Sequence, residues 1–167
     1  IEQVTIVPRR NALGFTAYSE ESFSQRSFDR QEVMDLICVA LGGRVAQRRY
    51  MAQLEGDQAL DKGSDAGAES DLRQATRLAW QAITAWGLDT EFGWVSTQPW
   101  SDDATIPASL EARATQRVKA WIDEARARTE QVVETNWPVV RQLAEGLLTD
   151  EMVLGEKLAL LLKGAQA

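Results

Sequence analysis

The chain has 167 residues, of which 44% are hydrophobic and 26% charged, and its formal net charge is −7. These proportions are ordinary for a soluble globular protein, and the length suffices for one domain with a hydrophobic core. The acidic balance argues against a nucleic-acid partner, because proteins that bind nucleic acids usually carry a basic face. No apolar run reaches the length of about 18 residues that a membrane-spanning helix needs.

The sequence contains no histidine and a single cysteine, Cys38. These counts exclude a Ser-His-Asp or Cys-His catalytic arrangement and an internal disulfide within the chain. Cys38 lies in an apolar stretch, and we predict that it is a small buried core residue. The first residue is Ile1 rather than Met, so we expect the chain to begin inside a longer protein.

The N-terminal part predicts a small β element. The β-branched run Gln3–Val7 is stopped by Pro8 and is typical of a strand, and residues 13–18 predict a second one. Two strands alone are marginally stable, so we expect them to pack on helices.

Apolar residues spaced by three and four predict a first helix over residues 28–51, with Ser27 as its N-cap. Gly42 and Gly43 fall inside this pattern and cost about 1 kcal/mol each relative to alanine. Either another backbone or a site approaches closely at these glycines, or the helix kinks or breaks there. Residues 54–67, rich in glycine, aspartate and serine, predict a loop.

A second helix is predicted over residues 68–86, with Gly87 as its C-terminal cap. Asp71 stands at the head of an apolar face formed with Ala75, Leu78 and Ala82. Because burying an unpaired charge is expensive, this carboxylate needs a partner. Two partners are possible: the helix dipole with the free backbone N–H groups of the first turn, or a metal ion.

The rest of the chain predicts a loop and then helices. Residues 88–107 lack a clear period, and we expect Trp94 and Trp100 to anchor this loop to the core. Helices follow over residues 109–136, from Pro138 to about residue 149, and over about 154–162. The predicted fold class is mainly α, a helical bundle with a small N-terminal β element. We expect residues 1–107 to form a core and residues 108–167 a C-terminal helical bundle of the same domain.

Several segments, in the same order along the chain, resemble the FtsH family of ATP-dependent AAA+ zinc metalloproteases. They are residues 4–9 and 12–16, the Leu-Gly-Gly-Arg segment 41–46, the segment 67–76, residues 85–88 with 92–93, and the terminal helices around Asn136, Leu143 and Leu147. The resemblance implies a peptidase domain whose zinc-binding HExxH helix is absent from this chain. The chain alone should therefore be inactive.

The resemblance also implies roles for individual residues. Asp71 would be the third zinc ligand, beside two histidines supplied upstream. Gly14, Phe15 and Thr16 correspond to an edge strand that binds an extended polypeptide substrate. The family usually has acidic residues where this chain has Gln47 and Arg48. Gln47 could accept a hydrogen bond from a histidine ligand but would not supply a charge.

The resemblance further implies ATP bound in a separate upstream AAA+ module, a homo-oligomer that is hexameric in the family, and a place on the cytoplasmic side of a membrane. Any membrane anchor would lie outside this chain. Two other readings stay open. One is a non-catalytic relative that acts as an interaction or assembly module, motivated by Gln47, Arg48 and the missing histidines. The other is an unrelated helical bundle.

Overall fold

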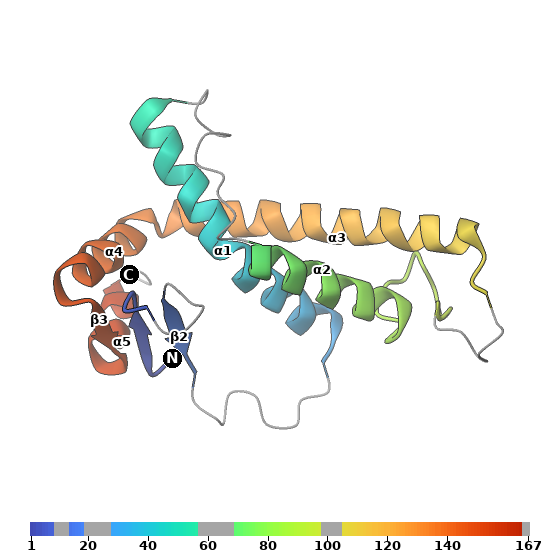
Figure 1. Ribbon diagram of the computed structural model, residues 1–167, viewed down its shortest axis with the longest axis horizontal. Coiled ribbons are helices and arrows are strands. Elements are labelled where there is room, and N and C mark those ends of the chain that lie inside the picture. The colour runs from blue at the N-terminus through green and yellow to red at the C-terminus, as the bar shows by residue number, and fades with distance from the viewer. Residues whose placement is uncertain (9–13, 19–27, 57–68, 98–104, 165–167) are drawn as a thin grey trace. The chain divides into compact units, whose positions relative to one another are not determined.

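A computed structural model describes residues 1–8, 14–18, 28–56, 69–97 and 105–164. The fold is mainly helical, as predicted, with five helices and one small antiparallel sheet among these residues (Figure 1). The chain divides into two compact units. One contains residues 28–133, and the other combines residues 1–27 with residues 134–167.

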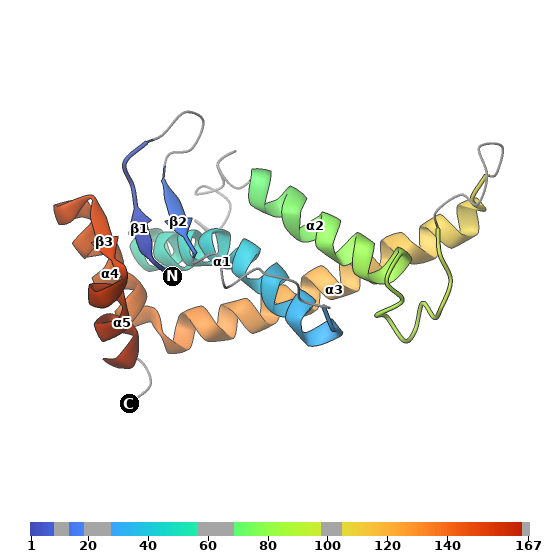
Figure 2. The same cartoon turned by 90° about the horizontal axis from the view of Figure 1, so that it is seen from below.

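Three helices make up the larger unit: α1 (Arg30–Glu55), α2 (Glu69–Thr84) and most of α3 (Ala108–Thr135) (Figure 2). Helix α1 begins two residues later than predicted. Its N-cap is Asp29, whose carboxylate accepts from the backbone N–H of Glu32 at 2.8 Å, while the Glu32 carboxylate accepts from the N–H of Asp29. This reciprocal pair satisfies two backbone donors at once, which explains why the helix begins there. Ser27, the predicted cap, lies outside the described residues.

The core of this unit joins the three helices and the loop after α2. The predicted apolar stripes supply it, with Trp121, Ile37 and Ile83 fully buried and Cys38 packed at its edge. The Cys38 thiol lies 3.5 Å from the carbonyl oxygen of Ala125. Cys38 is therefore only half-buried, at the contact between α1 and α3, and not fully enclosed as predicted.

Helix α1 runs through Gly42 and Gly43 without a break in its helical assignment. A Cβ atom built on either glycine meets no atom within 4 Å in the part of the chain that the structure describes. The expectation of a close backbone approach at this pair is therefore wrong for the described residues. Gly87, in contrast, has the predicted capping role, with φ of +64° and the N–H of Leu88 donating to Ala82 at 2.9 Å.

The smaller unit contains a three-stranded antiparallel sheet with the order β2-β1-β3. Its strands are β1 (Gln3–Thr5), β2 (Phe15–Ala17) and β3 (Met152–Leu154), and they pack with helices α4 (Trp137–Asp150) and α5 (Gly155–Gly164). Strand β3 replaces the start of the last predicted helix, which begins at Gly155 and not at Leu154. Leu147, Val153 and Leu158 form the small core of this unit.

Strand β1 ends before the predicted Val7 because Thr5 turns the chain. The Thr5 hydroxyl accepts from the N–H of Val7 at 3.1 Å and donates to the carbonyl of Glu151 at 2.9 Å. Glu151 caps α4 with φ of +57° and also accepts from the N–H of Ile6. The buried Thr5 is thus one of the contacts that join the two ends of the described chain, beside the pairing of β1 with β3.

Replacing Gly43 with alanine should raise the free energy of unfolding by about 0.5–1 kcal/mol, because alanine loses less conformational entropy in a helix. Gly14→Ala should have the opposite effect, since its Cβ would lie 2.5 Å from the carbonyl oxygen of Thr5. Chemical denaturation measures both variants. A Gly43→Ala protein that unfolds more easily than wild type would contradict the open surroundings of this glycine.

Candidate metal-ligand and substrate sites

Asp71 is the third residue of helix α2, in its first turn together with Glu69. Its side chain is half-buried, and the Ser70 hydroxyl lies 3.4 Å from its Oδ1 atom. One and three turns further along, Ala75 and Ala82 are fully buried, so Asp71 does stand at the head of the predicted apolar face. In this position it complements the positive end of the helix dipole, which is one of the two roles that the sequence left open.

A metal ion would need more ligands than Asp71 provides. The described ranges contain no group of three or more histidine, cysteine, aspartate or glutamate side chains placed to hold one. The whole sequence has no histidine, and its one cysteine is engaged with Ala125 on α3. Since a catalytic zinc usually takes three protein ligands, Asp71 could serve only as one member of a set completed by another stretch of polypeptide.

Gln47 and Arg48 lie on the second half of α1, in the same unit as Asp71. Both are half-buried. The Arg48 guanidinium lies 3.9 Å from the Glu130 carboxylate of α3, so this basic residue has a partner on the neighbouring helix. The pair is partly exposed and contributes about 1 kcal/mol or less to stability. Arg48 is therefore held by a partner on α3, at a position where the resemblance led us to expect an acidic residue.

Gly14, Phe15 and Thr16 lie in the smaller unit, at and just before β2. Strand β2 pairs with β1 alone in the described sheet, with Thr16 opposite Val4, so it is an edge strand as predicted. Gly14 approaches the backbone of Thr5 and Ile6 too closely for any side chain, which gives this glycine a structural role. Thr16 is exposed.

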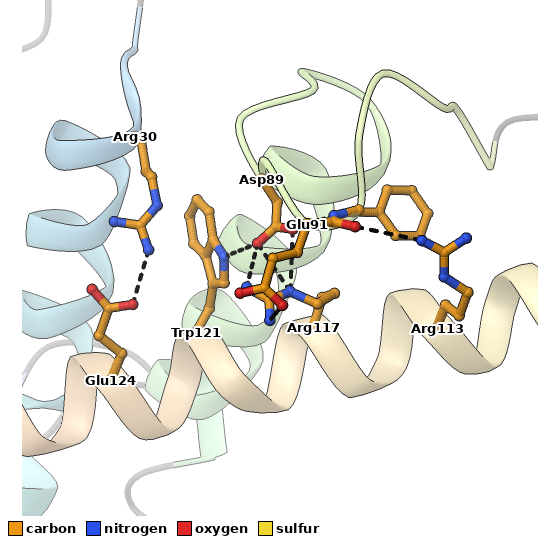
Figure 3. A network of polar contacts seen from close by, with 8 residues as sticks. Arg30, Asp89, Glu91, Arg113, Arg117, Trp121 and Glu124 are labelled. Atoms are coloured by element: carbon orange, nitrogen blue, oxygen red, sulfur yellow. Dashed lines mark hydrogen bonds and ion pairs between the residues drawn. The ribbon is translucent and has the colours of Figure 1, made fainter.

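The structure reveals a buried carboxylate that sequence reasoning missed, Asp89, in the loop after α2 (Figure 3). Its side chain is 2% exposed and accepts from the Trp121 indole N–H at 2.6 Å and from the Phe92 backbone N–H at 2.6 Å. The Arg117 guanidinium donates to both carboxylate oxygens, at 2.8–3.1 Å. Arg117 also binds Glu91 at 2.6 Å.

Opposing effects act on the ionisation of Asp89. Burial alone would raise its pKa, but hydrogen bonds from Arg117, Phe92 and Trp121 favour the charged form and leave the pKa below its ordinary value. Every oxygen of this carboxylate is occupied by a donor within the protein. The arrangement therefore fits a structural anchor and offers no open position for a ligand. In the sequence, Arg117 and Trp121 are four residues apart on a predicted helix and therefore lie on the same face, where both could donate to one acidic side chain.

Trp94 does not anchor the loop as expected. Its side chain is 97% exposed, and the buried anchors of this loop are Asp89 and Phe92. Trp100, the other expected anchor, lies outside the described residues.

Comparison with known proteins decides the family. Residues 1–161 match the family described as Peptidase family M41. The chain belongs to peptidase family M41. The resemblance to FtsH proteases is thereby confirmed over nearly the whole chain.

Individual relatives agree with this assignment. The chain is 31% identical to the ATP-dependent zinc metalloprotease FtsH of Thermus thermophilus, over 98% of the chain and 26% of the relative. It is 28% identical to FtsH 3 of Synechocystis, over 100% of the chain and 28% of the relative. For the mitochondrial FTSH 10 of Arabidopsis thaliana, the identity is 28%, over 93% of the chain and 19% of the relative. The chain thus spans about a fifth to a quarter of these relatives.

Asp89→Asn should lower the free energy of unfolding by about 3 kcal/mol, because the amide nitrogen cannot accept from Arg117 and the buried pair is broken. Glu91→Gln is the matched control. Glu91 is 71% exposed, so its loss should cost about 1 kcal/mol or less. Urea denaturation of both variants measures the difference, and equal costs would contradict the anchoring role of Asp89.

The same contact has a pH dependence of known sign. The pKa of Asp89 is lower in the folded than in the unfolded protein, so its ionised form adds to the free energy of unfolding. This stabilisation is fully present above the unfolded-state pKa of about 4 and is lost as the pH falls through the lower folded-state pKa. The wild type should lose more stability on acidification below pH ~4 than the Asn variant does.

Proposed function

We propose that this chain forms the rear part of the proteolytic domain of an ATP-dependent zinc metallopeptidase that acts on polypeptides. Asp71 would supply one zinc ligand, and two histidines of an HExxH helix outside residues 1–167 would supply the others. The observation that carries the proposal is the half-buried carboxylate of Asp71 in the first turn of α2, within a match to peptidase family M41.

The position of Asp71 suits a ligand that meets a metal at the surface of its helix. On its face Ala75 and Ala82 are buried and Leu78 is half-buried, which fixes α2 against the core, while the carboxylate itself stays half-open. A ligand carried on a packed helix is held more accurately than one on a loop. Gln47, half-buried on α1, is the proposed hydrogen-bond acceptor for one of the histidine ligands.

Strand β2 supports the proposed substrate site. The carbonyl of Ala17 accepts from the N–H of Glu2 at 2.9 Å and therefore faces β1. Because backbone groups alternate in direction along a strand, those of Thr16 face away from β1. We infer that an extended polypeptide pairs with this edge at Thr16, flanked by Gly14 and Phe15.

The remaining parts of the proposal come from the relatives. They are named ATP-dependent zinc metalloproteases, and we infer that an AAA+ ATPase module, which binds ATP, works with this domain in a homo-oligomer, a hexamer. We place the domain on the cytoplasmic side of a membrane, with any anchor outside this chain. Among the described helices, none is long and apolar enough to cross a membrane.

A second candidate function is a non-catalytic interaction or assembly module. It is favoured by the absence of histidine from the sequence and by Arg48, which pairs with Glu130 on α3. Under this alternative Asp71 would only complement the dipole of α2. The two candidates differ in one measurable quantity, the zinc content of the natural protein.

The natural protein, isolated in its longest form, should contain one zinc ion per chain by elemental analysis. Asp71→Asn should weaken zinc binding at least about tenfold, because a neutral amide replaces the charged ligand. Glu69→Gln is the matched control. Glu69 lies in the same helical turn but is 69% exposed and paired with Arg73, so its loss should leave the zinc in place. A natural protein without zinc would favour the non-catalytic module.

Thr16→Pro should abolish binding of an extended peptide without unfolding the domain. Proline removes the N–H that faces the open edge of β2, and edge strands tolerate it there. Thr16→Val, which keeps the N–H, should bind the peptide like wild type. Fluorescence anisotropy of a labelled unfolded peptide measures binding, with circular dichroism as a check on folding. Unchanged binding by the proline variant would remove β2 from the substrate site.

A further inference from the structure

A cavity of about 280 Å³ opens at the C-terminal end of α2, inside the larger unit. Trp86, Gly87 and Trp94 line it together with Ala85, Val95 and Ser96. The loop closes back on the helix, since the N–H of Thr97 donates to the carbonyl of Thr84 at 3.3 Å. The two indole rings are the largest groups that line this cavity.

The two tryptophans differ in how they are held. Trp86 is 42% exposed and stacks on Phe28, with ring centroids 6.1 Å apart and an interplanar angle of 21°. Trp94 is 97% exposed, although a tryptophan buries on the order of 200 Å² when it is packed. Its ring therefore leaves a large aromatic face open to an incoming group.

Other aromatic rings of the same unit carry a cation. The Arg30 guanidinium lies 5.0 Å from the ring centroid of Trp121, and that of Arg113 lies 5.8 Å from Phe92. In contrast, the six residues that line the cavity include no lysine or arginine.

The helix end adds a second attraction for positive charge. The helix dipole of α2 places a partial negative charge at this end, although the carbonyls of Ala82 and Thr84 already accept from Leu88 and Thr97, and a cation near it is stabilised. An open indole face attracts a cation through its quadrupole, most strongly for tryptophan. The chain as a whole carries a net charge of −7.

We propose that the cavity between Trp86 and Trp94 binds the cationic side chain of a basic polypeptide segment, an arginine or a lysine. The guanidinium or ammonium group stacks on the Trp94 ring and faces the carbonyl end of α2. This site contains none of the residues proposed to bind zinc or to pair with a substrate strand, and it does not depend on zinc. It provides a second point of contact with a polypeptide, selected by positive charge.

The test uses the 167-residue chain and two blocked tripeptides, acetyl-Gly-Arg-Gly-amide and its citrulline counterpart, which has nearly the same shape and no charge. The indole N–H signal of Trp94, assigned by its disappearance in Trp94→Phe, reports binding by NMR titration. We expect saturable shifts with the arginine peptide and at least about threefold weaker binding of the citrulline peptide.

Variants at position 94 separate a cation–π contact from simple apolar contact. Trp94→Phe should bind the arginine peptide more weakly than wild type, and Trp94→Leu more weakly still, at unchanged thermal stability because the side chain is exposed. Equal binding of both peptides, or equal binding by Trp94→Leu, would overturn the proposal. A Trp94 signal that shifts with protein concentration alone would show that a second copy of the chain occupies the cavity, and would also overturn it.

Discussion

The contact between Asp89 and helix α3 is the constraint on which the larger unit depends. Helix α2 ends at Thr84 and is capped at Gly87, and the loop beyond it has few apolar residues to bury. Asp89 fixes this loop by accepting from Arg117 and Trp121, while Phe92 enters the core beside it. Because the carboxylate is buried and fully hydrogen-bonded, moving the loop would leave an unpaired charge in an apolar region. The position of the end of α2 follows from this contact, and with it the geometry of the Trp86–Trp94 cavity.

The smaller unit depends on a different kind of connection. Strand β1, near the start of the chain, pairs with β3, near its end, and Thr5 joins the strand to the cap of α4 through Glu151. The N–H of Gly155 donates to the carbonyl of Glu2 at 2.7 Å. A Cβ atom at Gly155 would lie 2.9 Å from the carbonyl oxygen of Ile1, so a side chain at this position would clash with the start of the chain. The edge strand β2 is therefore held in place, through β1, by residues from the far end of the sequence.

Local signals in the sequence predicted most of the helices and the edge strand, because helical periodicity and turn residues act over a few positions. The failures share a cause in long-range contacts. Strand β3 is only three residues long and becomes a strand through β1, about 150 positions away. Asp89 looks like an ordinary loop residue until Arg117 and Trp121 are brought to it. Trp94 was expected in the core because tryptophan is apolar, but composition does not reveal which way a loop residue faces. Asp71 was singled out by its place at the head of an apolar face and by the family resemblance together, and its role as a ligand stays a prediction.

The central claim is that Asp71 is a zinc ligand completed by histidines from outside this chain. A crystal structure of the natural protein, with diffraction recorded at the zinc absorption edge, tests it most directly. The account predicts an anomalous peak about 2.0–2.2 Å from a carboxylate oxygen of Asp71, with two histidine nitrogens at a similar distance. An empty position at Asp71, with the carboxylate bound only to backbone N–H groups of the first turn of α2, would contradict it.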